Sequence, residues 1–239
     1  MAHVSPAGRH PSSRQRRSRS LLAAPLLLFV AVTALAAGYV AYVLWPRWPG
    51  GPVALNAPSM PIMVGGAMFN IEPAAIRMSV QRHAGTQDRV DLAYLWPSLV
   101  PPDPAEKTNV GAPLNPNDRL FVTIAITDGT LPPIERVKTI YPRYLAPEAT
   151  AANDGLTMRA FRNGTPYEGE DLVYDAAAPE TFFMRCARKG VGNAGICLDE
   201  RRIGDADVTL RFPRDWLTDW KNVAERFNRL IVRLHPETK

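Results

Sequence analysis

The sequence predicts an α+β protein with one N-terminal transmembrane helix, a mostly antiparallel β domain and a closing amphipathic helix. Three observations support this fold class. Residues 21–45 carry no charge, residues 119–212 alternate strand-like segments with turn residues, and residues 215–234 repeat apolar side chains at helical spacing. We expect a basic tail at 1–20, a transmembrane helix at 21–45, a Pro/Gly-rich linker at 46–61 and one α+β domain at 62–239.

The uncharged run is long enough to cross a membrane. Its 25 residues would form a helix about 37 Å long, and roughly 20 apolar residues span the hydrocarbon. Trp45 and Trp48 are typical of a membrane–water interface. A cleaved signal peptide is the alternative, but its apolar part is usually about 7–15 residues. We therefore favour an uncleaved anchor. Ala34 and Gly38 have the small-residue spacing that permits dimerisation through the span, although an alanine-rich run produces it by chance.

Charge predicts the orientation of this span. Five arginines and no acidic residue precede it, and the positive-inside rule places such a tail in the cytoplasm. All 23 acidic residues follow the span together with 23 of the 28 basic ones, so the domain is neutral by count. The pI of about 9.4 thus belongs to the tail, and we expect no nucleic-acid partner.

Composition predicts the compartment. Arginine outnumbers lysine 23 to 5, and alanine and proline are abundant, which is typical of bacterial proteins from GC-rich genomes. We therefore expect a single-pass inner-membrane protein, with the N-terminus in the cytoplasm and the C-terminal domain in the periplasm.

The first part of the domain contains three strand candidates and two short helices. The strands are expected at 61–69, 90–96 and 119–127, and the helices at 73–78 and from Pro132 to Pro142. Between the second and third strand, residues 97–116 are rich in proline and predict a long exposed loop.

The second part reads as an antiparallel meander. Asn163-Gly164 is a hairpin signal, and Gly204-Asp205 is a second turn. The expected strands are 156–161, 171–174, 181–188, 196–203 and 208–212.

Cys186 and Cys197 are the only cysteines, and they fall on consecutive strand candidates joined by a short loop. An oxidising compartment makes a disulfide the expected outcome. Two free thiols with a redox or metal role are the alternative, but the sequence offers neither a CxxC spacing nor a nearby histidine.

Two groups of residues are candidates for binding a partner, such as another envelope protein. In the closing helix, Trp216, Trp220 and Phe227 lie on one apolar stripe, which either packs on the sheet, the interpretation we favour, or stays exposed for a partner. The second candidate is a basic group on the cysteine hairpin, with acidic residues interspersed, formed by Arg185, Arg188, Arg201 and Arg202.

Motifs that would indicate catalysis are missing from the sequence. Residues 190–195 match G-x-G-x-x-G, but a strand-like segment follows where a nucleotide site needs a helix. His83 and His235 are the only histidines after the span, and both are expected on the surface. There is no HExxH, GxSxG or P-loop motif. We expect no cofactor, no metal and no catalytic residue that the sequence identifies.

Several phrases of the domain resemble uncharacterised single-pass membrane-anchored proteins of proteobacteria: IERVKTIYPRYL, GTPYEGEDLVYD, FFMRCARKG and RFPRDWLTDW. This resemblance implies the same topology and brings no activity, ligand or catalytic residue. The sequence therefore predicts an accessory or protein-interaction module of the cell envelope. The alternative is an envelope-acting hydrolase whose site matches no motif.

Overall fold

The computed structural model describes residues 17–44, 53–103, 118–188, 190 and 195–236. These form two separate units, the N-terminal helix and the domain that follows it. Helix α1 spans Arg17–Leu44. Its segment Ala24–Val43 is apolar and has no buried side chain, so by length and composition this helix could cross a membrane.

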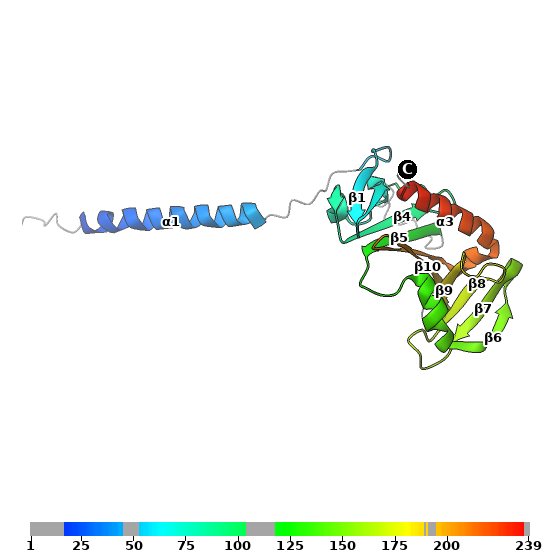
Figure 1. The fold of residues 1–239 in the computed structure, drawn as a ribbon. Coiled ribbons are helices and arrows are strands. Elements are labelled where there is room, and N and C mark those ends of the chain that lie inside the picture. The colour runs from blue at the N-terminus through cyan, green and yellow to red at the C-terminus, as the bar shows by residue number, and fades with distance from the viewer. Residues whose placement is uncertain (1–16, 45–52, 104–117, 189, 191–194, 237–239) are drawn as a thin grey trace, which may run out of the picture. The chain divides into compact units, whose positions relative to one another are not determined.

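An eight-stranded antiparallel sheet forms most of the domain, in the order β4-β5-β11-β10-β9-β8-β7-β6 (Figure 1). From β6 to β11 the strands are joined as a meander, and β5 lies between β4 and β11. The strand bounds are β4 Arg89–Leu95, β5 Arg119–Ile126, β6 Leu145–Ala151, β7 Leu156–Phe161, β8 Glu170–Asp175, β9 Phe183–Ala187, β10 Ile196–Ile203 and β11 Ala206–Pro213.

A second, three-stranded sheet has the order β2-β1-β3, with β1 at Met60–Val64, β2 at Ala67–Ile71 and β3 at Gly85–Thr86. The expectation of one strand at 61–69 is therefore wrong, because Gly65-Gly66 folds it into a hairpin. Both glycines have positive φ, which suits such a turn. At Gly65 a Cβ would lie 2.2 Å from the carbonyl oxygen of Asp205, so the close approach of the β10–β11 turn also requires glycine here.

Helix α3, Trp220–Leu234, lies across one face of the main sheet (Figure 1), after a 3₁₀ segment at Arg214–Asp219. Its apolar stripe belongs to the principal core, together with residues of β1, β2, β4, β5, β10 and β11. Trp220 and Phe227 are 7% and 0% exposed. The ring of Trp216 stacks on that of Trp96, with 4.2 Å between the ring centroids. The structure thus supports the packed interpretation of this stripe, and Trp216, Trp220 and Phe227 hold the helix to the domain.

The opposite face of the sheet carries a smaller core. Its buried members are Tyr141, Leu145, Phe161 and Leu172. The covering segment is helical throughout, with α2 at Pro133–Glu135, a π-helical turn at Arg136–Ile140 and a 3₁₀ turn at Tyr141–Arg143. Contrary to expectation, Pro142 does not end this segment, because the last turn is a 3₁₀ turn with proline near its start, where a missing N–H costs no bond.

The remaining differences from the expected elements are local. Strand β6 was not predicted, since its sequence, LAPEATA, is poor in β-branched and aromatic residues. Asn163-Gly164 lies within the longer β7–β8 connection rather than in a two-residue turn. Short 3₁₀ turns occur at Pro73–Ala75, Ser79–Gln81 and Asn153–Gly155. Most of the predicted 97–116 loop and of the 190–195 loop lies outside the described residues.

Candidate functional site: the open edge of strand β10

The β9–β10 hairpin carries the predicted disulfide. Cys186 and Cys197 are joined, completely buried and directly opposite each other, with their Cα atoms 4.0 Å apart. This separation is typical of a non-hydrogen-bonded pair in an antiparallel ladder. The disulfide therefore fixes the register of the hairpin at this point.

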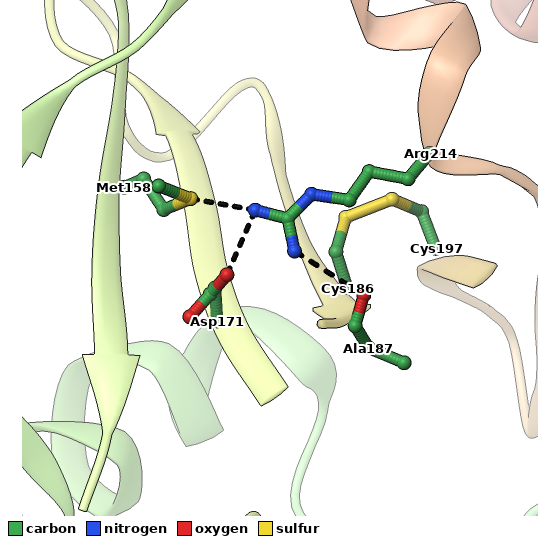
Figure 2. Close-up of a disulfide and its surroundings, with 6 residues drawn as sticks. All are labelled: Met158, Asp171, Cys186, Ala187, Cys197 and Arg214. Carbon is green, nitrogen blue, oxygen red and sulfur yellow. Dashed lines mark hydrogen bonds and ion pairs between the residues drawn. A yellow bond between two sulfur atoms is a disulfide. The ribbon is translucent and has the colours of Figure 1, made fainter. Parts of the chain in front are cut away.

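A buried ionic network supports the strands next to the disulfide (Figure 2). Arg214, just after β11, reaches Asp171 of β8 at 2.7 Å and donates a hydrogen bond to the carbonyl of Ala187 at 3.2 Å. Arg188 pairs with the other carboxylate oxygen of Asp171 at 2.9 Å. Asp171 is only 5% exposed, and two guanidinium groups compensate its burial. This network joins the end of β11 to β8 and β9.

Strand β10 has a neighbour on both sides for only part of its length. Strand β11 pairs with every residue from Ile196 to Ile203, whereas β9 pairs with Cys197 and Leu198 alone. Beyond Leu198, no described strand pairs with the side of β10 that faces away from β11. We call this side of Asp199–Ile203 the open edge.

The backbone groups at the open edge belong to Glu200 and Arg202. A two-residue turn joins β10 to β11, so Ile203 and its partner Ala206 form the hydrogen-bonded pair that closes the hairpin. Every second residue back along β10 then bonds to β11. The N–H and C=O groups of the intervening residues, Glu200 and Arg202, consequently point to the open edge.

The disulfide leads independently to the same assignment. Because Cys186 and Cys197 are a non-hydrogen-bonded pair, the next residue, Leu198, bonds toward β9. Glu200 and Arg202 follow Leu198 at intervals of two residues, so their backbone groups point to the same side of β10 as those of Leu198. Two features at opposite ends of β10 thus agree on which backbone groups lack a strand partner.

A cavity of about 270 Å³ lies along the open edge. We call it the β10 cleft. Its walls come from the segment before α2, from the chain that enters β9 and from β10 itself, and the lining residues are Pro132, Pro133, Ile134, Glu180, Thr181, Phe182, Phe183, Asp199, Glu200, Arg201 and Arg202. This lining contains no histidine, cysteine or serine; its polar side chains are one threonine, three carboxylates and two arginines.

Each charged side chain that lines the cleft forms an ion pair, of which the one made by Glu180 is solvent-exposed. Asp199 pairs with Arg201 at 2.8 Å and Glu180 with Lys138 at 3.2 Å, and Arg202 pairs with Asp207. Glu200 is shared between Arg136 at 3.3 Å and Arg185 at 3.4 Å. A ligand in the cleft therefore meets apolar rings, proline and unpaired backbone rather than a net charge.

The four arginines predicted as one basic group are divided between the two faces of the sheet. Arg185 and Arg202 lie on the face of the smaller core, where Arg185 also pairs with Glu170 at 2.8 Å. Arg188 and Arg201 lie on the face of the principal core, where Arg201 donates to Asn228 of α3 at 2.7 Å. All four are ion-paired, so they do not form a single basic patch; Arg201 and Arg202 do line the cleft.

The histidines lie away from the cleft. His83 is exposed, and its ring contacts the carbonyl of Ala84 at 3.2 Å. His235 is half-buried rather than fully exposed as expected, because its ring contacts the carbonyl of Met68 at 2.7 Å and packs on Phe69. In the described part of the chain no group of His, Cys, Asp and Glu could hold a metal ion.

Sequence reasoning missed the open edge. Strand β9 continues to Phe183 in its pairing with β8 but pairs with β10 only as far as Arg185, and nothing in the strand expected at 181–188 marks this divergence. The Pro132–Ile134 wall comes from a segment more than sixty positions earlier in the chain. No local pattern predicts that meeting, although the paired prolines could have marked an irregular segment.

Comparison with known proteins gives two matches of low similarity. No protein-family model matches the chain, and no curated protein matches it. An immunity protein of the Stenotrophomonas maltophilia type IV secretion system shares 17% identity and a TM-score of 0.49, over 74% of this chain and 92% of its own. The Neisseria meningitidis iron-regulated outer membrane lipoprotein FrpD shares 9% identity and a TM-score of 0.42, over 74% and 93%. At these values neither match contributes to the argument about function.

Proposed function

We propose that this protein is a membrane-anchored binding module of the bacterial cell envelope, which takes an extended segment of a partner protein at the open edge of β10. Helix α1 would be the uncleaved anchor in the inner membrane, with the domain in the periplasm. The observation that carries the proposal is the unpaired backbone of Glu200 and Arg202 beside a cavity.

An extended peptide is the ligand that best matches this edge. Unpaired strand edges are templates for pairing with another chain, and strand addition supplies affinity through main-chain hydrogen bonds. Glu200 and Arg202 each present one donor and one acceptor, as Leu198 does where β9 is still in place. A partner strand would pair with β10 beyond Leu198, on the side where β9 pairs with Cys197 and Leu198.

The side chains of the cleft favour the same type of ligand. Phe182 is buried and Phe183 half-buried, and with Pro133 they provide apolar contacts for alternate side chains of an added strand. Because the charges around the cleft are already paired, a highly charged ligand would have to break an existing ion pair. We therefore expect a partner segment that is apolar or weakly charged.

Photocrosslinking in native membranes tests this function. The full-length chain is made with a photoreactive amino acid at Thr181, which is exposed on the cleft wall, and in parallel at Thr218, which is exposed in the 3₁₀ segment before α3. We expect an adduct at Thr181 only, with the crosslinks mapping to one contiguous segment of one partner. Identical adducts at both positions, or none at Thr181, would overturn the proposal.

A further inference from the structure

A second hollow lies between helix α3 and the turn that follows β4, and it shares no lining residue with the β10 cleft. Arg226, Arg229 and Arg233 line it together with Leu230 and the turn Ser98-Leu99, and its volume is about 260 Å³. The three arginines are spaced by three and four positions, so they occupy one face of the helix. Three guanidinium groups therefore border one small cavity.

Arg226 is held in place by neutral groups. Its Nη1 donates to the carbonyl of Pro97 at 2.7 Å, and its Nε donates to the Asn222 side-chain oxygen at 2.8 Å. The guanidinium also lies 5.6 Å from the centre of the Trp96 ring. These contacts fix its position without neutralising its charge.

Arg233 is held in the same manner. Its Nη2 donates to the carbonyl of Leu99 at 2.6 Å, and the guanidinium lies 5.4 Å from the centre of the Tyr94 ring. A guanidinium has five N–H donors, so most donors of Arg226 and Arg233 are not used by the described hydrogen bonds. Both charges are positioned before any ligand arrives, which lowers the cost of binding.

In the described part of the chain, neither Arg226 nor Arg233 forms an ion pair with an acidic side chain. Glu225 approaches Arg229 at 3.6 Å, but both side chains are more than 60% exposed, and such surface pairs contribute little. Glu72, which lies near the Tyr94 hydroxyl, forms no ion pair with Arg233 among the described residues. The hollow contrasts with the β10 cleft, whose arginines are paired with carboxylates.

We propose that this hollow binds a phosphate group, carried either by an anionic lipid headgroup or by a small phosphate ester in solution. Arginine forks match phosphate oxygens in bidentate geometry, and three such groups provide more donors than a single carboxylate could accept. The Ser98 hydroxyl lies at the same cavity, where it donates to the Leu95 carbonyl at 3.4 Å, so it would have to exchange this bond to donate to a phosphate oxygen.

Arginine side-chain NMR of the full-length protein in nanodiscs tests this site. In phosphatidylcholine nanodiscs, inorganic phosphate is titrated at constant ionic strength, with chloride as the comparison; a second sample carries phosphatidylglycerol without added phosphate. Saturable shifts of the Arg226 and Arg233 N–H signals with phosphate would identify a soluble ester as a sufficient ligand. The same shifts only with phosphatidylglycerol would identify a headgroup. Either result supports the site.

Two variants separate binding from general charge effects. Arg229→Gln removes a solvent-exposed member of the site, and Arg211→Gln removes an exposed arginine on the sheet. We expect the first to weaken binding about tenfold or more, because a charge-assisted hydrogen bond is lost, and the second to leave it unchanged. Equal effects of the two variants, or shifts that chloride reproduces, would overturn the proposal.

Discussion

Cys186 and Cys197 face each other across the β9–β10 hairpin, and the two strands separate beyond the next pair of residues, Arg185 and Leu198. The disulfide thus lies one residue before the last point where β10 has a strand on both sides. It ties the chain together at the position where the ladder opens, and the open edge begins two residues further along β10. The stabilising disulfide and the proposed binding edge therefore lie in the same hairpin.

The disulfide should stabilise the domain directly. Replacing both cysteines by alanine (C186A with C197A) should lower the free energy of unfolding by about 3 kcal/mol, since the bond closes a loop of about a dozen residues in the unfolded chain. Urea unfolding of the oxidised protein and the double variant measures the difference. A change below about 0.5 kcal/mol would mean that the bond contributes little beyond local packing.

Hydrogen exchange should reveal the open edge in the absence of a partner. The amides of Asp199 and Arg201 bond to β11 and should exchange slowly, whereas those of Glu200 and Arg202 should exchange much faster. Residue-resolved exchange by NMR tests the pattern. Equal protection of all four amides would show that another group covers this edge.

Asp91 should contribute a pH-dependent part of the stability. Hydrogen bonding from Arg89, assisted by Gln81 and Thr123 and opposed by burial, lowers the pKa of the Asp91 carboxyl from 3.8 to about 2. A carboxyl with a lowered pKa stabilises the folded state above its unfolded pKa, and this contribution disappears as the pH falls through the folded pKa.

The measurement compares Asp91→Asn with the unchanged protein by denaturant unfolding at pH 7, 4 and 2. The variant should be the less stable of the two at pH 7, and the gap should shrink between pH 4 and pH 2. A gap that stays constant over this range would show that ionisation of Asp91 does not contribute.

The stripe of helix α3 should behave as core. Phe227→Ala should lower the free energy of unfolding by about 3–5 kcal/mol, because the ring is completely buried and its removal leaves a cavity. Val232→Ala on the same helix is the control, since Val232 is 66% exposed and should change stability by less than about 0.5 kcal/mol. Similar, small effects of both substitutions would contradict the packed position of the helix.

Local patterns in the sequence predicted much of this fold. Strand-like segments separated by turn residues indicated β5, β7, β8, β10 and β11, and apolar residues at helical spacing indicated α3. The disulfide followed from two cysteines on neighbouring strands. In each case the signal lies within a few residues of the element that it describes.

The candidate site depended on contacts that no local pattern encodes. Pairing of β9 with β10 ends at Arg185 although β9 itself continues to Phe183 beside β8, and Pro133 reaches the cleft from a distant segment. The surroundings of the predicted basic group also depended on contacts that no local pattern encodes. Arg185 lies in β9 and Arg188 directly follows that strand, and each pairs with a carboxylate of β8 that the sequence did not place beside it.

Pairing of a partner strand with the backbone of β10, as proposed, can be tested directly. Binding of the segment identified by crosslinking to Thr181 should be compared between two variants, Arg202→Ala and Arg202→Pro. Both lose the ion pair with Asp207, but only proline also removes the N–H at the open edge, at a position where no strand bond of the domain is broken. We predict that Arg202→Ala binds the segment and that Arg202→Pro, still folded, does not. Equal binding by the two folded variants would contradict strand addition at this edge.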